Sequence, residues 1–177
     1  IGGKTLLQRI VDTASPQVGP LVLNTNSDPS LFRDYGLPVV PDVIDGFAGP
    51  LAGVLTGLDW AAANTPECDW VASFACDAPF APADLVARLL DVVAADDADM
   101  ACAVSGGRDH PVFALWPVRL IDELRAAVID EGVRKVDIWT ARYKLARVEY
   151  GTENSDPFFN INRREDLDTA AALLAGS

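Results

Sequence analysis

The segment Trp70-Val71-Ala72-Ser73-Phe74-Ala75-Cys76-Asp77-Ala78-Pro79 carries an apolar run directly into a turn that bears a carboxylate. Residues 70–74 are predicted to form a strand, with Asp77 just beyond its C-terminal end. A carboxylate in this position can bind a hard cation such as Mg²⁺ through oxygen, and the cation would neutralise phosphate oxygens during attack on phosphorus. Asp-Ala-Pro is also good turn chemistry, so spacing alone leaves Asp77 as a metal ligand or as a turn residue.

Predicted strands and helices alternate along the rest of the chain. The strands are expected at residues 20–24, 37–40, 70–74, 100–104, 112–116 and 145–149. Helical spacing predicts helices over residues 6–14, 28–35, 51–63, 82–94, 118–130, 134–141 and 164–174. This alternation favours an α/β fold with a mostly parallel sheet and helices on both faces. We find no repeat or linker, so residues 1–177 are expected to form one domain.

The chain is acidic, with 14 Lys and Arg against 26 Asp and Glu and a formal net charge of −12 at pH 7. This balance argues against a general nucleic-acid binder, which needs a basic surface. It does not exclude a phosphorylated small molecule, because a few local cations and a metal can outweigh the global sign. The sequence shows no membrane-spanning run and no signal pattern, so we expect a cytoplasmic protein without a membrane partner.

The cysteine pattern predicts neither disulfides nor a zinc site. Cys68, Cys76 and Cys102 are odd in number and have no CxxC spacing. Cys76 and Cys102 lie in apolar stretches and are expected to be buried. His110 is the single histidine, which excludes a metal site built from several histidines.

Polar residues follow two further predicted strands. Asn24 ends the strand at 20–24, and Asp42 follows the strand at 37–40. In α/β sheets ligands bind beyond the carboxyl ends of the strands, so Asn24, Asp42 and Asp77 fall where a site is expected. The Asn24 amide can pair with a base edge, and Asp42 can accept two hydrogen bonds from the N1–H and amino groups of guanine. Each can instead be a turn residue that satisfies its own backbone.

A glycine-rich segment from Gly46 to Gly53 opens the helix predicted at 51–63. Backbone N–H groups at a helix N-terminus can hold an anion or a base edge. The segment is not a Walker loop, because no Gly-Lys-Ser/Thr follows it. Close packing of the backbone is the alternative explanation for its glycines.

Three other groups of polar residues each have two interpretations, one functional and one structural. Arg108-Asp109-His110-Pro111 is predicted to lie in a turn, where His110 is a general base or a solvated residue. Asn160 and Asn162 alternate in strand fashion, so their amides would face one way to bind a polar ligand, or would cap the last helix. Arg134 and Lys135 offer charge for a phosphate, or form a solvated helix end.

Taken together, these stretches resemble the molybdenum cofactor guanylyltransferase family. The likeness spans nearly the whole chain, and the matching segments occur in the family's order with similar gaps. These segments are Gly3-Lys4, Leu23-Asn24-Thr25-Asn26, Val40-Pro41-Asp42, Gly49-Pro50-Leu51-Ala52-Gly53, Cys76-Asp77-Ala78-Pro79-Phe80, Arg108-Asp109-His110-Pro111 and Phe159-Asn160-Ile161-Asn162.

The resemblance implies a Rossmann-like nucleotidyltransferase that moves GMP from GTP to molybdopterin with Mg²⁺ and releases pyrophosphate. By position, Asn24 and Asp42 would contact the guanine nucleotide. Asp77 would bind the nucleotide and Mg²⁺ and would be the catalytic residue. The residues that would border the nucleotide are Gly49, Pro50, Leu51 and Gly53.

The resemblance also suggests where the acceptor would bind. Arg134, Lys135, Asn160 and Asn162 would lie toward the phosphate of the pterin. Arg108 and His110 match the family pattern, but the resemblance gives them no role. Molybdoenzymes or other proteins of cofactor synthesis are implied as partners, without a segment that identifies the surface used.

The start of the chain departs from the family. Family members begin with a strand and a glycine-rich phosphate loop of the type Leu-Ala-Gly-Gly, followed by Arg-Met-Gly and a Lys, whereas this chain begins just past that region. We expect an omitted N-terminal segment rather than a defective relative. A sheet without this central parallel strand would expose apolar strand edges.

Two alternatives to the guanylyltransferase stay open. A cytidylyltransferase for the same cofactor, or a sugar-phosphate nucleotidyltransferase, is the enzyme alternative. Asp42 argues for guanine, which offers two donors, over cytosine, which offers one exocyclic amine. The alternative outside the enzymes is a catalytically silent adaptor that binds the nucleotide or the cofactor.

Overall fold

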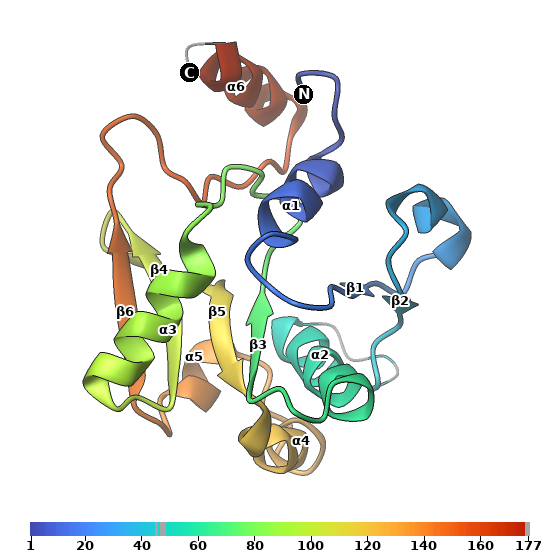
Figure 1. The fold of residues 1–177 in the computed structure, drawn as a ribbon, viewed down its shortest axis with the longest axis vertical. Coiled ribbons are helices and arrows are strands. Elements are labelled where there is room, and N and C mark those ends of the chain that lie inside the picture. Colours follow the sequence, from blue (N-terminus) through green and yellow to red (C-terminus); the bar gives the residue numbers. More distant parts are fainter. Residues whose placement is uncertain (45, 47–48, 176–177) are drawn as a thin grey trace.

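The computed structural model describes residues 1–44, 46 and 49–175, and arranges them as two sheets flanked by helices (Figure 1). The larger sheet has the strand order β3-β5-β4-β6. Its strands are β3 (Trp70–Ser73), β5 (Arg108–Pro117), β4 (Met100–Ser105) and β6 (Leu145–Tyr150). The smaller sheet pairs β1 (Leu23–Asn24) with β2 (Val39–Val40) in parallel. The α/β class is confirmed.

Three strands of the larger sheet run in one direction and β5 runs against them. β5 is antiparallel to both β3 and β4, whereas β4 and β6 are parallel. The reversal follows from a hairpin between β4 and β5. Its turn has only two residues, Gly106 and Gly107, with φ of +53° and +75°. Glycine adopts positive φ without steric cost, and a two-residue hairpin turn of this kind requires it at both positions.

The turn predicted around Arg108-Asp109-His110-Pro111 lies earlier in the chain and is shorter than expected, because only Gly106 and Gly107 form it. Ser105 is the last residue of β4 and Arg108 is the first of β5, so the two pair across the ladder. His110 lies opposite Ala103 and belongs to a strand, not to a turn.

Helices cover both faces of the larger sheet, as predicted. One face carries α1 (Leu6–Ala14) and α3 (Leu85–Asp96), and the other carries α2 (Pro50–Asn64), α4 (Ile121–Ile129) and α5 (Val136–Thr140) (Figure 1). The remaining helical segments are η1 (Pro29–Tyr35), η2 (Val118–Leu120) and α6 (Arg164–Ala175). In the part of the chain that the structure describes, none of the helices combines the length and apolar character that crossing a membrane requires.

β4 supplies side chains to both hydrophobic cores. Met100 and Cys102 pack with α2, α4 and α5, while Ala101 and Ala103 pack with α1 and α3. Successive side chains of a strand point to opposite faces, so a strand covered on both sides needs apolar residues at every position. The large rings of Trp116 and Trp139 fill the first core, with centroids 6.0 Å apart.

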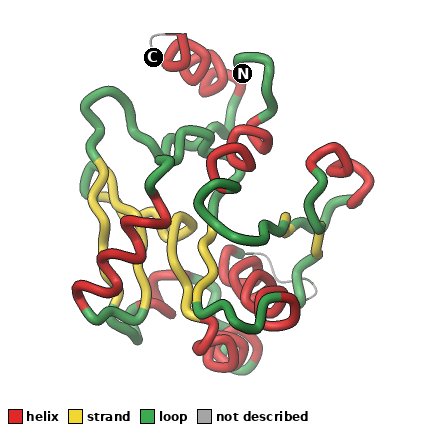
Figure 2. The backbone as a smooth tube through the Cα atoms, viewed as in Figure 1, coloured by secondary structure: helices red, strands yellow, loops and turns green. Residues whose placement is uncertain are grey.

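The segment around Asn160 and Asn162 is not a strand, which corrects the sequence prediction. Residues 151–163 form an irregular connection between β6 and α6 (Figure 2). Ile161 is buried and both neighbouring asparagines are exposed. Burial alternates here because the apolar Ile161 side chain anchors the loop. The N–H of Ile161 donates to the Asp77 carbonyl and not to a neighbouring strand.

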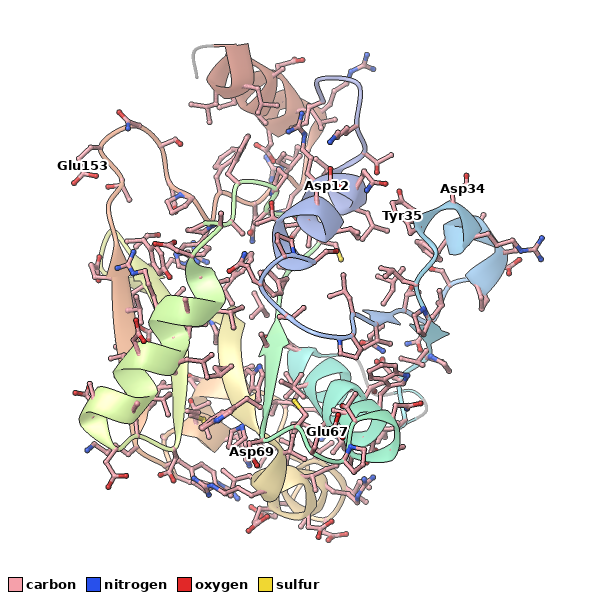
Figure 3. All side chains as sticks on the ribbon, in the orientation of Figure 1. Asp12, Asp34, Tyr35, Glu67, Asp69 and Glu153 are labelled. Carbon is pink, nitrogen blue, oxygen red and sulfur yellow. The ribbon has the colours of Figure 1, made fainter. Side chains whose placement is uncertain are left out.

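The acidic residues labelled in Figure 3 are exposed and come from several separate segments of the chain. They include Asp12, Asp34, Glu67, Asp69 and Glu153. These five carboxylates are therefore accessible to solvent.

We predict that Leu55→Ala lowers the free energy of unfolding by about 2–5 kcal/mol, because it empties volume in the core. Leu55 lies on α2 and is fully buried among the residues of the first core. Urea unfolding measures the change. The control is Leu90→Ala on α3, whose side chain is 39% exposed, and we expect it to stay within about 0.5 kcal/mol of the wild type. Equal losses in the two variants would contradict the core position of Leu55.

Candidate functional site

Asn24, Asn26 and Asp42 form a polar cluster at the carboxyl ends of β1 and β2. Asn24 Nδ2 donates to Asp42 Oδ1 over 3.0 Å, and Asn26 Nδ2 donates to Asp42 Oδ2 over 2.8 Å. The Asp42 N–H in turn donates to Asn26 Oδ1 over 2.8 Å. Parallel neighbouring strands end at the same edge, which is why residues 18 positions apart meet here. Each oxygen of Asp42 keeps a further lone pair that a ligand donor can use.

The convergence of Asn24 and Asp42 was expected from the sequence, whereas the part played by Asn26 was missed. Asn26 follows Asn24 by two residues, and its side chain holds both the backbone and the carboxylate of Asp42. The spacing of the two asparagines was the available signal. The role of Asn24 and Asp42 in nucleotide binding stays a prediction.

The N-terminus of α2 lies against this cluster. The helix begins at Pro50, and its N-cap Gly49 has a φ of +151°, which favours glycine. A Cβ added to Gly53 would lie 2.8 Å from Asn24 Oδ1, so only glycine allows the amide to approach the helix this closely. Leu51 is fully buried in the first core, so its side chain is not at the site and only its backbone can take part. Residues 47 and 48 of the predicted loop lie outside the described residues.

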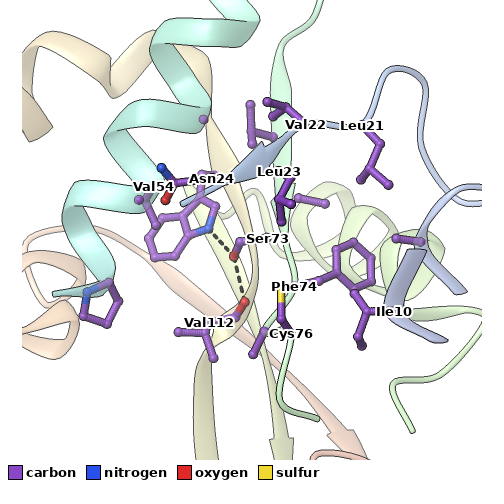
Figure 4. Close-up of a pocket in the computed structure, with 18 of the residues that line it drawn as sticks. Ile10, Leu21, Val22, Leu23, Asn24, Val54, Ser73, Phe74, Cys76 and Val112 are labelled. Carbon is purple, nitrogen blue, oxygen red and sulfur yellow. Dashed lines mark hydrogen bonds between the residues drawn. The ribbon is translucent and has the colours of Figure 1, made fainter. Parts of the chain in front are cut away.

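A cavity of about 340 Å³ opens between α1, β1, α2 and β3 (Figure 4). Its walls are mostly apolar and include Ile10, Leu23, Val54 and Val71. Its polar lining comes from Asn24, Asp42, Ser73 and the backbone of the α2 N-terminus. Ser73 is fixed by two bonds, since its hydroxyl donates to the Val112 carbonyl over 2.9 Å and accepts from the Trp116 indole over 2.8 Å. The volume lies in the range of small-molecule sites.

The cavity separates two strand edges. In the ladders of the described residues, β1 pairs only with β2 and β3 pairs only with β5. The other edge of each strand borders the cavity, with Leu23 on one side and Val71 on the other.

Asp77 lies in a turn beyond the end of β3, next to Cys76 at the wall of the cavity. Its backbone carbonyl accepts the N–H of Ile161 over 2.7 Å. Ala78 and Pro79 are buried directly behind it. The carboxylate is half-exposed, and in the described part of the chain no hydrogen bond or ion pair reaches it. The turn thus holds the backbone of Asp77, while both carboxylate oxygens keep lone pairs that can accept further bonds.

The donor set around Asp77 fits a magnesium ion that is shared with a substrate. Residues 1–44, 46 and 49–175 contain no group of three or more His, Cys, Asp or Glu side chains that could enclose a metal. Mg²⁺ usually keeps several waters and takes one or two carboxylates plus substrate phosphates, so a single carboxylate is a sufficient protein ligand.

The two cysteines expected to be buried, Cys76 and Cys102, differ in their exposure to solvent. Cys102 is buried on β4, and burial raises the pKa of its thiol to about 11. Cys76 is exposed, because it lies in the turn after β3 and not in the strand. Desolvation by neighbouring atoms and the Asp77 carboxylate raise the pKa of the Cys76 thiol. A thiolate is the nucleophilic form, so this environment disfavours thiol chemistry at the site.

The four residues assigned together to the acceptor lie at two different places. The Arg134 carbonyl is 3.6 Å from the position that a Cβ on Gly49 would take, which brings Arg134 and the exposed Lys135 to the start of α2. The Arg134 guanidinium donates to the Val128 carbonyl over 3.1 Å. Asn160 and Asn162 instead flank Ile161 beside Asp77.

His110 is neither solvated nor in a turn. It lies half-buried on β5, and its Nε2 is 2.7 Å from Ser105 Oγ. Burial lowers the pKa of His110, an effect that the nearby Asp156 carboxylate opposes and Arg108 reinforces. Arg108 is exposed at the start of the strand. Because its Nε2 is already bonded, His110 is not placed to act as a general base through that nitrogen.

We predict that Gly53→Ala displaces the Asn24 side chain and breaks its bond to Asp42, because the new methyl group would overlap Asn24 Oδ1. The NMR signals of the Asn24 side-chain amide would shift and its exchange with water would accelerate. Gly57→Ala is the matched control on the same helix, since its Cβ would meet Val71 at an ordinary 3.6 Å. Unchanged Asn24 signals in Gly53→Ala would show that the close approach is absent in solution.

Comparisons with known proteins agree with the resemblance seen in the sequence. A family model described as MobA-like NTP transferase domain matches residues 1–144. A protein of Bradyrhizobium sp. (strain ORS 278) named molybdenum cofactor guanylyltransferase is 53% identical over 175 residues, which cover 99% of this chain and 82% of that protein.

Two solved structures show the same fold. Molybdopterin-guanine dinucleotide biosynthesis protein A from Archaeoglobus fulgidus aligns with a TM-score of 0.74 at 22% identity, over 99% of this chain and 88% of that one. Rv0371C from Mycobacterium tuberculosis, in complex with manganese, aligns with a TM-score of 0.65 at 17% identity, over 98% and 88% of the two chains.

Proposed function

The chain belongs to the MobA-like NTP transferase family, and on that premise we propose that it transfers GMP from GTP to molybdopterin. Family membership makes it a nucleotidyltransferase. The observation that carries the finer proposal is the relative from Bradyrhizobium, which is about half identical over nearly the whole chain and is named for this reaction. The products are the molybdopterin guanine dinucleotide cofactor and pyrophosphate.

The guanine base would be read at the cluster of Asn24, Asn26 and Asp42. Both oxygens of Asp42 are oriented by amide donors, so the carboxylate is held in place before a ligand arrives. A carboxylate fixed in this way can accept the two adjacent donors of guanine, N1–H and the exocyclic amine. Gly49, Pro50 and Gly53 line the same cavity and offer the backbone of the α2 N-terminus to the nucleotide.

Asp77 would hold Mg²⁺ at the phosphates of GTP. When bound, the ion would neutralise phosphate oxygens and so lower the cost of charge that develops in the transition state. Asp77 suits this role because its carbonyl is fixed by Ile161 while its carboxylate projects without a bonded partner among the described residues. Rv0371C, which has the same fold, was solved in complex with manganese, and a metal-binding role for Asp77 agrees with that.

The reaction would be a direct displacement at the α-phosphorus of GTP. A terminal phosphate oxygen of molybdopterin forms the new bond to that phosphorus. The bond between the α-phosphorus and the bridging oxygen breaks, and pyrophosphate leaves with that electron pair. Asp77 is not the nucleophile. The protein's part is to hold the two phosphate groups in line, which can supply much of the rate by itself.

The acceptor phosphate would lie between two polar groups. Asn160 and Asn162 are exposed beside Asp77, and the Arg134-Lys135 pair lies beside Gly49. Amide donors and cations at these places would bind the molybdopterin phosphate next to the α-phosphate. Delivery of the product to molybdoenzymes, and a cytoplasmic location, remain proposals of the same kind.

We predict that Asp77→Asn lowers GMP transfer at least about 100-fold, because a neutral amide is a poor ligand for Mg²⁺ and one lost charge-stabilising group costs this much. Incorporation of label from α-³²P-GTP into the molybdopterin product measures transfer. Asp69→Asn is the matched control, because Asp69 is exposed just before the opposite end of β3. Full activity of Asp77→Asn would remove Asp77 from the mechanism, and an inactive wild type would favour the silent adaptor.

A cytidylyltransferase is the second candidate, and Asp42 distinguishes it from the first. We predict that Asp42→Asn lowers kcat/KM for GTP by roughly 10-fold or more, because an amide N–H would face guanine donors and such mismatches cost about 1–3 kcal/mol. The value for CTP should change much less. Asp34→Asn, an exposed carboxylate on η1, is the control. Equal losses with both nucleotides would argue against guanine reading by Asp42.

A further inference from the structure

A partly buried polar network joins the β4–β5 hairpin to the loop at 151–163. Ser105, at the end of β4, is 3% exposed, and its Oγ lies 2.7 Å from His110 Nε2 and 2.8 Å from Asp156 Oδ1. Neither the base site nor the metal ligand described above uses these three side chains. A buried polar group lowers stability unless it forms hydrogen bonds, so the buried Ser105 hydroxyl depends on its partners in both segments.

The direction of the hydrogen bonds in this polar network is fixed by counting protons. Ser105 has one hydroxyl proton and donates it to Asp156, whose carboxylate only accepts. Ser105 Oγ must therefore accept from His110, so Nε2 of His110 carries a proton. The order of donation runs from His110 through Ser105 to Asp156, and each bond needs the next one in place.

Asp156 also accepts hydrogen bonds from the backbone of the loop at residues 151–163. Its Oδ1 also accepts the N–H of Phe158 over 2.9 Å, and its carbonyl accepts the N–H of Phe159 over 3.2 Å. The Phe158 ring is buried, with its centroid 4.7 Å from that of His110 and 4.8 Å from that of Phe113. Residues 156–159 are thus held by directional bonds as well as by apolar packing.

The same loop then reaches the metal-binding turn. Ile161 is 7% exposed, and its N–H donates to the Asp77 carbonyl over 2.7 Å. Asn160 and Asn162 lie on either side of this bond. The route from His110 to Asp77 therefore consists of consecutive bonds through Ser105, Asp156 and the loop backbone.

We propose that Ser105, His110 and Asp156 are positioning residues that set the register of residues 156–162 against the turn of Asp77. Apolar packing of Phe158 alone would hold the loop near the sheet but would let it slide, because such packing is not directional. The hydrogen bonds of Ser105, His110 and Asp156 are directional and would therefore fix the loop in one register. They thereby orient the Asp77 carboxylate and the amides of Asn160 and Asn162. The kinetic consequence rests on the proposed function, whereas the structural one does not.

Amide hydrogen exchange tests the structural part. Ser105→Ala should speed exchange at Ile161 and Phe158 by roughly 10-fold, since local opening becomes easier when the bonds that resist it are removed. Asp156→Ala, on the loop itself, should do the same. Asp156→Asn should remain close to the wild type, because its amide oxygen can still accept from Ser105 and Phe158. Thr140→Val removes a buried hydroxyl on α5 and should leave both amides unchanged.

A kinetic measurement tests the consequence for the reaction. In Ser105→Ala and Asp156→Ala, kcat for GMP transfer should fall by roughly 10-fold while KM for GTP changes little, because the base site at Asn24 and Asp42 is untouched. Asp156→Asn should recover most of the lost kcat. If the wild type transfers no GMP, the proposed function fails, and the exchange measurement still decides on the network.

Two results would overturn the inference. One is unchanged exchange at Ile161 in both Ser105→Ala and Asp156→Ala. The other is an equal acceleration in Thr140→Val, which would show that exchange at Ile161 follows global stability and not this network.

Discussion

The burial of β4 on both faces is the constraint on which the rest of the structure depends. All six of its residues are buried, and both hydrophobic cores are built on its alternating side chains. A strand covered on both sides has no water to satisfy its backbone, so β5 and β6 must pair with it along its length. Its only side-chain hydroxyl, Ser105, falls at the end of the strand, where side chains from β5 and the 151–163 loop can satisfy it.

Hydrogen bonds also fix the two carboxylate-bearing residues of the candidate site, Asp42 and Asp77. Asp42 is held by two asparagine amides through both oxygens and its own N–H, and Asp77 is held through its carbonyl by Ile161. In both residues the carboxylate oxygens keep lone pairs that can accept further hydrogen bonds. If these carboxylates bind the nucleotide and the metal as proposed, this arrangement would reduce the entropy lost on binding.

Local patterns were enough to predict the α/β class, the helices, and the meeting of Asn24 with Asp42, because periodicity and strand ends are encoded in short segments. The mostly parallel sheet predicted from the alternation of strands and helices does not extend to β5, which the hairpin through Gly106 and Gly107 reverses. Asn160 and Asn162 were taken for a strand because a loop anchored by a single buried residue shows the same alternation as a strand. Cys76 was expected to be buried because its neighbours are apolar, but its side chain is exposed in the turn beyond the strand.

The unpaired edges of β1 and β3 have a consequence for how these residues behave in solution. Within the described part of the chain, each edge offers backbone donors and acceptors beside an apolar wall. Such edges can recruit any extended peptide of suitable hydrophobicity, including one from a second copy of the molecule, by strand addition. Association at high concentration would then depend on what covers the two edges as well as on the net charge of −12 that the sequence carries.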